Sequence, residues 1–219
     1  MTAEKRQIFI AGATGYMGQR LAAELARRGH AVSGLVRSGS ESKLPAGCAP
    51  VTGNALDAAT FRDKIGAADT FVQLVGVAHP SPAKAKQFRE IDLVSCQQSV
   101  AAAVANNVKH FVYVGVAHPA PVMHAYIDVR SKCEDTIRAA GLNATILRPW
   151  YVLGPGHYWP YLLIPGYWLA RQIPGMRESA TRLGLVTLQQ MLAALVQSVE
   201  KPANGIRIVE VPEIAKGRL

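Results

Sequence analysis

Cysteine is scarce in this 219-residue sequence, and a long apolar run is missing from its start. Cys48, Cys96 and Cys133 are far apart, odd in number and form no CxxC pair. This spacing argues against a zinc site or a redox dithiol, so we expect no metal and thiols that are buried or idle. The opening "MTAEKRQ" has no apolar core of a signal peptide. We therefore expect a cytoplasmic protein with no transmembrane segment.

Acidic residues are the minority charge, with 15 Asp and Glu against 24 Lys and Arg, which gives a net charge of +9. A basic balance can indicate a nucleic-acid partner. The basic residues are scattered, however, and the largest local cluster is only Lys84, Lys86 and Arg89. We expect no nucleic acid as partner, because attraction to a phosphorylated cofactor or an acidic metabolite explains the charge.

Hydrophobic residues make up 49% of the chain and charged residues 18%, which is an ordinary globular composition. Apolar runs alternate with segments of helical spacing. We predict strands at 7–11, 31–37, 49–54, 69–78, 108–115 and 143–148, and helices at 16–29, 57–65, 84–107 and 124–140. This alternation predicts an α/β fold with a doubly wound parallel sheet and right-handed crossovers.

The character of the sequence changes after residue 148. Residues 149–170 contain no Asp, Glu, Lys or Arg, but hold all three tryptophans and four of the seven tyrosines. Repeated Pro and Gly exclude a membrane helix here. We expect one domain over 1–219: a core over about 5–150, a small aromatic lobe over about 150–185, and a helix and strand returning over about 186–212. The lobe is packed, lines a pocket, or faces a partner.

Three glycines stand three apart in "GATGYMG", residues 12–18, between an apolar strand and a helical pattern. Gly12 allows a sharp turn, Gly15 allows the backbone to approach a pyrophosphate, and Gly18 allows the helix to pack on the sheet. The helix N-terminus offers free N–H groups to phosphates. The motif predicts dinucleotide binding, and the alternative is a tight turn without a ligand.

The motif "GATGYMG" resembles the fingerprint of short-chain dehydrogenases/reductases of the extended and atypical kinds, relatives of nucleotide-sugar epimerases and dehydratases. Further stretches are similar to that superfamily: "GNALD" at 53–57, "VKHFVYVG" at 108–115, "LRPWYVLGPG" at 147–156 and "GLVTLQQMLAALVQSVEKP" at 184–202. The resemblance implies a Rossmann-type sheet with a small C-terminal substrate lobe. It implies cofactor contacts at Gly12, Thr14, Gly15, Tyr16, Met17, Gly18, Asn54, Ala55, Leu74, Val75, Gly76, Arg130, Pro149 and Val152.

The end of the second strand bears on the choice of dinucleotide. An Asp or Glu there would bind the ribose hydroxyls of NAD, but this sequence has Arg37, followed by Ser38 and Ser40. A guanidinium can bind a 2′-phosphate in a forked geometry. We expect NADP as cofactor, with NAD the weaker alternative; otherwise Arg37 is simply a solvated residue at a strand end.

The resemblance implies an active site built from a Ser and a YxxxK helix motif. The candidate is "YIDVRSK", residues 126–132, in which Tyr126 and residue 130 share a helix face but residue 130 is Arg. Arg130 stays cationic and could stabilise a Tyr126 phenolate and donate to the ribose, although it cannot pass a proton on. Lys132 lies two positions further and points elsewhere. Alternatively, Tyr126 is a packed helix aromatic.

The Ser of that family has no counterpart here, since Gly115 and Val116 stand in its place. His118 or His124 could supply a hydrogen bond instead, although a loop His is more often solvated. Two hypotheses follow. The first is an NADP-dependent oxidoreductase or epimerase-like enzyme that acts on a small organic carbonyl or alcohol through Tyr126 and Arg130. The second is a catalytically silent dinucleotide-binding sensor, regulator or complex subunit.

The aromatic stretch after Trp150 bears on the substrate. An uncharged lining suits an apolar or aromatic ligand better than a sugar nucleotide, whose diphosphate needs charged partners. Arg171, Arg177 and Arg182 follow and could restore that capacity. If the stretch is exposed instead, it marks a contact in a homo-oligomer or with a partner subunit.

Overall fold

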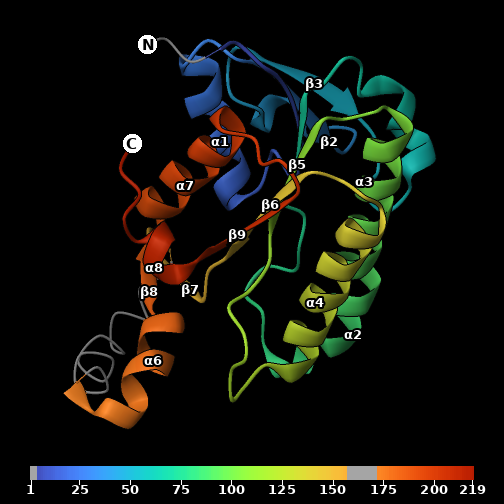
Figure 1. The fold of residues 1–219 in the computed structure, drawn as a ribbon. Helices are drawn as coiled ribbons and strands as arrows, with labels where there is room; N and C mark the ends of the chain where they lie inside the picture. The colour runs from blue at the N-terminus through green and yellow to red at the C-terminus, as the bar shows by residue number, and fades with distance from the viewer. Residues whose placement is uncertain (1–3, 157–171) are drawn as a thin grey trace.

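The computed structural model describes residues 4–156 and 172–219 (Figure 1). Seven strands form one parallel sheet in the order β3-β2-β1-β4-β5-β6-β9. The strands are β1 Gln7–Ala11, β2 Ala31–Val36, β3 Cys48–Thr52, β4 Thr70–Gln73, β5 His110–Val114, β6 Ala144–Arg148 and β9 Ile206–Glu210. The order reverses between β1 and β4, so a crevice opens at the carboxyl ends of these two strands. The predicted doubly wound Rossmann-type sheet is confirmed.

Helices cover both faces of the sheet (Figure 1). On one face lie α1 (Tyr16–Arg27) and α7 (Leu188–Glu200), and on the other α3 (Val94–Ala105) and α4 (His124–Ala139). Strand β1 is buried on both sides, because Ile8 and Ile10 enter the core under α1 and α7 while Phe9 and Ala11 enter the core under α3 and α4. This two-sided burial explains why the strand is a continuous apolar run.

Two of the predicted helices differ from the structure. Residues 57–65 form two short 3₁₀ turns, Ala58–Thr60 and Arg62–Lys64, rather than one helix. Asp57 does cap the first turn, since its Oδ1 accepts from the Ala59 N–H at 3.0 Å. The Thr60 hydroxyl donates to the Asp57 carbonyl and accepts from the Asn54 N–H. Phe61 has a φ of −138°, outside the helical range, so no α-helix continues through these turns.

The predicted helix over 84–107 is also interrupted. A 3₁₀ turn at Pro82–Lys84 leads into α2 (Ala85–Gln87), a π-helical turn at Phe88–Leu93, and then α3. The predicted strand over 69–78 ends at Gln73, whose side-chain Oε1 accepts from the Val75 N–H at 3.1 Å and turns the chain out of the sheet. Both departures lie beside the crevice.

Residues after β6 add smaller elements that the sequence pattern did not predict. Strands β7 (Tyr151–Leu153) and β8 (Leu185–Thr187) pair in parallel, and α6 (Pro174–Arg182) and α8 (Val211–Ile214) flank them. Thr187 and Gln190 form a capping box at the start of α7, where the helix was predicted to begin. The predicted aromatic lobe falls largely on 157–171, including Trp159 and Trp168, which lie outside the described residues.

Within the described ranges, no helix is both long enough and apolar enough to cross a membrane. The same residues contain no group of three His, Cys, Asp or Glu side chains able to hold a metal ion. All three cysteines are free; Cys96 and Cys133 are buried and Cys48 is half-buried.

Candidate functional site

The glycine turn links β1 to α1 at the crevice. Gly12 has φ +87°, and a Cβ there would meet the Leu74 carbonyl carbon at 2.8 Å. A Cβ on Gly18 would overlap the Gly12 carbonyl oxygen. Gly15 caps α1 with ordinary φ, is exposed, and would meet only the Gly12 oxygen at 3.2 Å. Gly12 and Gly18 are therefore required by the packing, whereas Gly15 leaves open space above the helix N-terminus.

A cavity of about 350 Å³ lies at this turn. It gathers nine of the predicted cofactor residues from four separate segments of the chain, and we call it the dinucleotide cavity. These residues are Gly12, Thr14, Gly15, Arg37, Asn54, Ala55, Leu74, Val75 and Gly76. Sequence reasoning missed Leu35, Val36, Gly53, Leu56 and Ile91 in its lining. The first four adjoin predicted residues and follow from convergent strand ends; Ile91 lies on the π-helical turn, for which there was no sequence signal.

The other predicted cofactor residues lie outside this lining: Tyr16, Met17, Gly18, Ser38, Arg130, Pro149 and Val152. Met17 and Val152 pack against the core, and the Pro149 carbonyl accepts from the Ala117 N–H. The Tyr16 ring stacks under the Arg20 guanidinium at 4.6 Å, and its hydroxyl reaches the backbone at Gly154. Ser38 is exposed in the turn after Arg37. Their role in cofactor binding stays a prediction.

Arg37 is the one charged residue in the lining of the dinucleotide cavity, which contains no Asp or Glu. It is exposed at the end of β2, and its guanidinium makes no hydrogen bond or ion pair with any residue that the structure describes. Asn54 is fixed by its own turn, where its Oδ1 accepts from the Leu56 N–H at 3.0 Å. The cavity therefore presents one free cation to a ligand.

Arg130 lies behind the wall of this cavity, in a buried cluster. Its Nη2 donates to Asp92 Oδ1 at 2.6 Å, and its Nη1 donates to the Tyr113 hydroxyl at 3.2 Å and the Val114 carbonyl at 2.9 Å. A Cβ on Gly76 would meet Arg130 Nη2 at 2.5 Å, so the guanidinium lies directly against the cavity lining. Its Nε is buried and unpaired among the described residues. Most of the N–H donors of the Arg130 guanidinium therefore already have partners inside the protein.

Asp92 connects this cluster to the crevice and was not predicted as a site residue. Its Oδ2 accepts from the Val77 N–H at 3.0 Å, just beyond the cavity-lining Gly76. Burial raises the pKa of the Asp92 carboxyl, while the Arg130 guanidinium and the Val77 N–H act to lower it.

Tyr126 is half-buried in the first turn of α4. Its ring lies 4.9 Å from the Phe88 ring and 4.9 Å from the Arg130 guanidinium carbon. Burial raises the pKa of the Tyr126 hydroxyl, and the neighbouring Arg130 offsets only part of this rise. Tyr126 is thus packed against its neighbours, and it is protonated at neutral pH.

The loop after β5 supplies no hydroxyl where the resembling family has its Ser. Val116 is buried, and the Gly115 N–H donates to the Leu147 carbonyl at 2.8 Å. His118 is half-buried with Nδ1 3.0 Å from the Val116 carbonyl, which leaves Nε2 as the free acceptor in the neutral ring. His124 is exposed at the start of α4, and Lys132 is exposed further along it.

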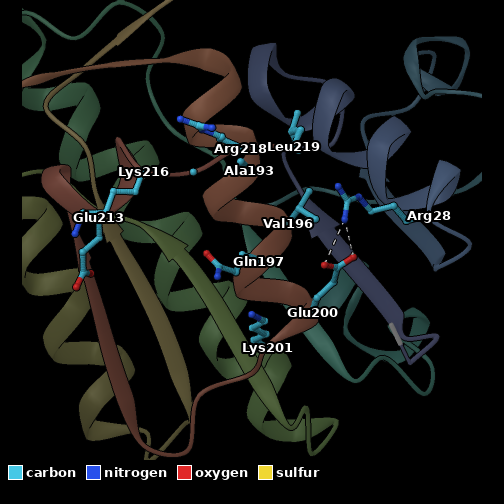
Figure 2. Close-up of a pocket in the computed structure, with 11 residues that line it drawn as sticks. Arg28, Ala193, Val196, Gln197, Glu200, Lys201, Glu213, Lys216, Arg218 and Leu219 are labelled. Atoms are coloured by element: carbon cyan, nitrogen blue, oxygen red, sulfur yellow. Dashed lines mark hydrogen bonds and ion pairs between the residues drawn. The ribbon is translucent and has the colours of Figure 1, made fainter. Parts of the chain in front are cut away.

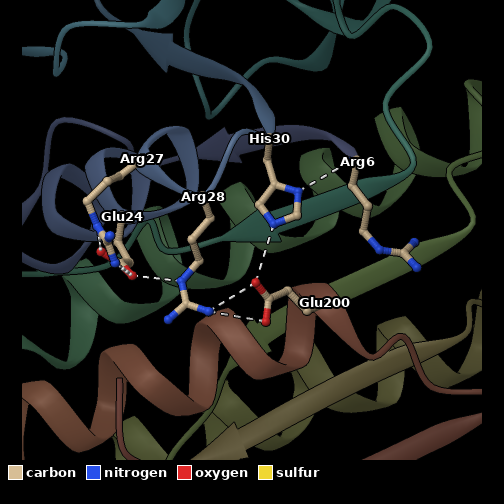
Figure 3. Close-up of polar contacts among 6 residues, drawn as sticks. All are labelled: Arg6, Glu24, Arg27, Arg28, His30 and Glu200. Carbon is tan, nitrogen blue, oxygen red and sulfur yellow. Dashed lines mark hydrogen bonds and ion pairs between the residues drawn. The ribbon is translucent and has the colours of Figure 1, made fainter. Parts of the chain in front are cut away.

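Two polar features lie away from the crevice. At the amino edge of the sheet, Glu200 at the end of α7 accepts from Arg28 at 3.2 Å and lies 3.5 Å from His30 Nε2 (Figure 3). A cavity of about 580 Å³ runs along α7 and the segment after α8, with Lys201, Glu213, Lys216 and Arg218 among its lining (Figure 2). Its charges are of both signs, and it contains none of the predicted site residues.

Residues 12–155 match the model of a family described as NAD(P)H-binding. A maize protein, "Isoflavone reductase homolog IRL", is 28% identical in an alignment over 165 residues that covers 66% of this chain; the chain spans about half, 48%, of that relative. Among solved structures, the Bordetella bronchiseptica enzyme WbmH in complex with NAD+ has a TM-score of 0.70 at 22% identity, covering 94% of this chain and 75% of that one. UDP-N-acetylglucosamine 4-epimerase from Bacillus cereus has a TM-score of 0.69 at 16% identity, covering 97% and 84%. At these identities, the structural likeness shows the fold.

Proposed function

The chain belongs to the family of NAD(P)H-binding proteins, as its resemblance to atypical short-chain dehydrogenases/reductases predicted, and from this premise we propose that it is an NADP-dependent oxidoreductase. It catalyses redox chemistry on a small organic carbonyl or alcohol, or an epimerisation that passes through one. The observation that carries the proposal is the dinucleotide cavity, in which the open Gly15 position and the free cation Arg37 lie in one lining. In this proposal the protein is cytoplasmic.

The lining fits a dinucleotide. Gly15 leaves space that a Cβ would occupy, and no side chain among the described residues caps the N-terminus of α1, so the first N–H groups of the helix are available to a pyrophosphate. The apolar Leu35, Leu56 and Ile91 suit an adenine ring.

The charge of the cavity supports NADP rather than NAD. Discrimination against the 2′-phosphate needs a carboxylate, and the lining has none. Arg37 is free to form a forked, charge-assisted contact with that phosphate, and Ser38 follows it with a hydroxyl. The structure of WbmH contains NAD+, but that protein is only 22% identical to this chain.

When bound, the dinucleotide supplies or accepts a hydride. Tyr126 is then the group that gives a proton to the substrate oxygen, because its raised pKa keeps it protonated. The Arg130 guanidinium lies over the Tyr126 ring in a cation–π contact and remains paired with Asp92.

A second function is favoured by the same cluster. Arg130 is occupied by Asp92, Tyr113 and Val114, and the loop after β5 has Gly115 in place of a hydroxyl. A chain that holds the dinucleotide without turning it over, as a sensor, regulator or subunit of a homo-oligomer or larger complex, would have these features.

Calorimetric titration with NADPH and with NADH tests the proposal. We expect tighter binding of NADPH, a preference lost in Arg37→Ala. Arg62→Ala is the matched control, because Arg62 is also exposed and lies outside the cavity lining. Equal affinity for both dinucleotides in the wild type would overturn the NADP assignment, and absence of binding would overturn the function as a whole.

A further inference from the structure

A second cavity, of about 410 Å³, lies where the loop after β5 enters α4. Both this cavity and the dinucleotide cavity border the π-helical turn, because Phe88 lines this cavity and Ile91, three residues later, lines the other. Its walls are almost wholly apolar; they include Pro82, Phe88, Pro121, Val122, Met123 and Tyr126.

The chemistry of this lining selects against charged ligands. It contains no Asp, Glu, Lys or Arg, and its one titratable ring besides Tyr126 is the exposed His124. Lys84 is near Pro82 in the chain, but its ammonium already donates to the carbonyls of Ala78 at 2.6 Å and His79 at 3.0 Å. Among the residues that line this cavity, a diphosphate would therefore find no Lys or Arg, whereas an apolar ring would pack against apolar walls.

The backbone at the cavity wall is strained. Met123 has φ +63° and ψ 32°, a left-handed conformation that a residue with a side chain rarely adopts. Its carbonyl accepts from the Tyr126 and Ile127 N–H groups at 3.0 Å, which holds the first turn of α4 in this geometry. Strain of this kind is concentrated at ligand sites. Beside Met123, Val122 is 50% exposed and offers apolar surface for a ligand to cover.

We propose that this cavity is the substrate subsite and takes an uncharged aromatic or cyclic apolar group, with the reacting oxygen near Tyr126. The inference rests on the proposed function, since it names the substrate class of the same site. Under this proposal, sugar nucleotides do not bind in this subsite.

Binding of 2-acetylnaphthalene, an uncharged aryl ketone, tests the proposal by ligand-observed NMR on the full chain, with and without NADPH. Val122→Asp places a carboxylate on the cavity wall and should weaken binding about tenfold, because the ring must displace water from the charge. Val104→Asp is the matched control: Val104 is 46% exposed on α3, outside the lining, and should leave the affinity within about twofold of the wild type. UDP-glucose should not displace the ketone.

Equal affinity in the two variants, displacement by UDP-glucose, or no binding at millimolar ketone would each overturn the subsite. Failure of the proposed function gives a different result, because NADPH binding is measured separately by calorimetry. A chain that binds the ketone in a Val122-dependent way but binds no dinucleotide would keep the subsite and lose the oxidoreductase.

Discussion

Arg130 Nη2 lies 2.6 Å from Asp92 Oδ1, and this buried ion pair joins α4 to the π-helical turn before α3. Asp92 also accepts from the Val77 N–H, so the pair connects α4 to the loop that follows β4. Residues of this loop line the dinucleotide cavity. Removing the carboxylate would leave a guanidinium buried without its partner, which is costly in a low-dielectric interior.

We expect Asp92→Ala to lower the free energy of unfolding by about 3–5 kcal/mol in urea denaturation. Glu90→Ala is the control from the same turn. It breaks the Lys86–Glu90 pair, whose side chains are 79% and 58% exposed, and should cost less than about 0.5 kcal/mol. Similar losses in the two variants would mean that the Asp92–Arg130 pair does not stabilise the fold.

The glycine turn yields a prediction that separates folding from binding. Gly18→Ala should destabilise the protein by about 1–3 kcal/mol, because the new Cβ overlaps the Gly12 carbonyl oxygen. Gly15→Ala should fold almost as stably as the wild type, since its Cβ meets one atom at 3.2 Å, but should bind NADPH at least about tenfold more weakly. Urea denaturation and calorimetry on both variants provide the measurements. Full NADPH affinity in Gly15→Ala would contradict the role of this position.

The sheet strands were predictable because β1, β4, β5 and β6 are buried on both faces and therefore form apolar runs. Strands β7 and β8 were not, since each has only three residues, which are too few to show a strand pattern. The π-helical turn was missed for a different reason. Its buried Asp92 is stabilised by Arg130 and Val77, and no local periodicity signals those contacts.

The candidate site was likewise predictable from the sequence only in part. Gly12, Gly15 and Arg37 were predicted from local motifs, and parallel strands bring their ends into one cavity. The environment of Arg130 could not be derived from "YIDVRSK", because its carboxylate partner lies 38 positions earlier in the chain. The apolar cavity beside Tyr126 depends on Met123 adopting a left-handed backbone, which the sequence does not encode in a recognised motif.

His110 predicts a pH dependence of stability. Its ring is buried at the start of β5, with Nε2 3.0 Å from Thr145 Oγ1, and burial together with Arg207 and Arg6 lowers its pKa to about 4. The unfolded chain, with a His pKa near 6.5, takes up this proton first as the pH falls. The free energy of unfolding that depends on His110 being neutral is therefore fully present above about pH 6.5 and is lost as the pH falls towards 4.

Urea denaturation between pH 4.5 and 7.5 should reveal this slope, up to about 1.4 kcal/mol per pH unit for one proton. His110→Gln cannot titrate and should flatten the slope, whereas His124→Gln, at an exposed position, should leave it unchanged. An unaltered slope in His110→Gln would assign the pH dependence to other groups.

Tyr126 decides between the enzyme and the silent dinucleotide-binding protein. Because burial raises the pKa of its hydroxyl, carbonyl reduction should be independent of pH through neutrality, whereas oxidation of the alcohol, which needs the phenolate, should accelerate as the pH rises. Tyr126→Phe keeps the ring against Phe88 and removes only the hydroxyl, so NADPH binding should persist while kcat falls about 100-fold. The measurement is the steady-state rate of NADPH oxidation with a panel of aryl ketones. Undiminished kcat in Tyr126→Phe would exclude this proton donor. A wild-type chain that binds NADPH but reduces no ketone in the panel would favour the sensor, because Arg130 would then serve only the buried pair with Asp92.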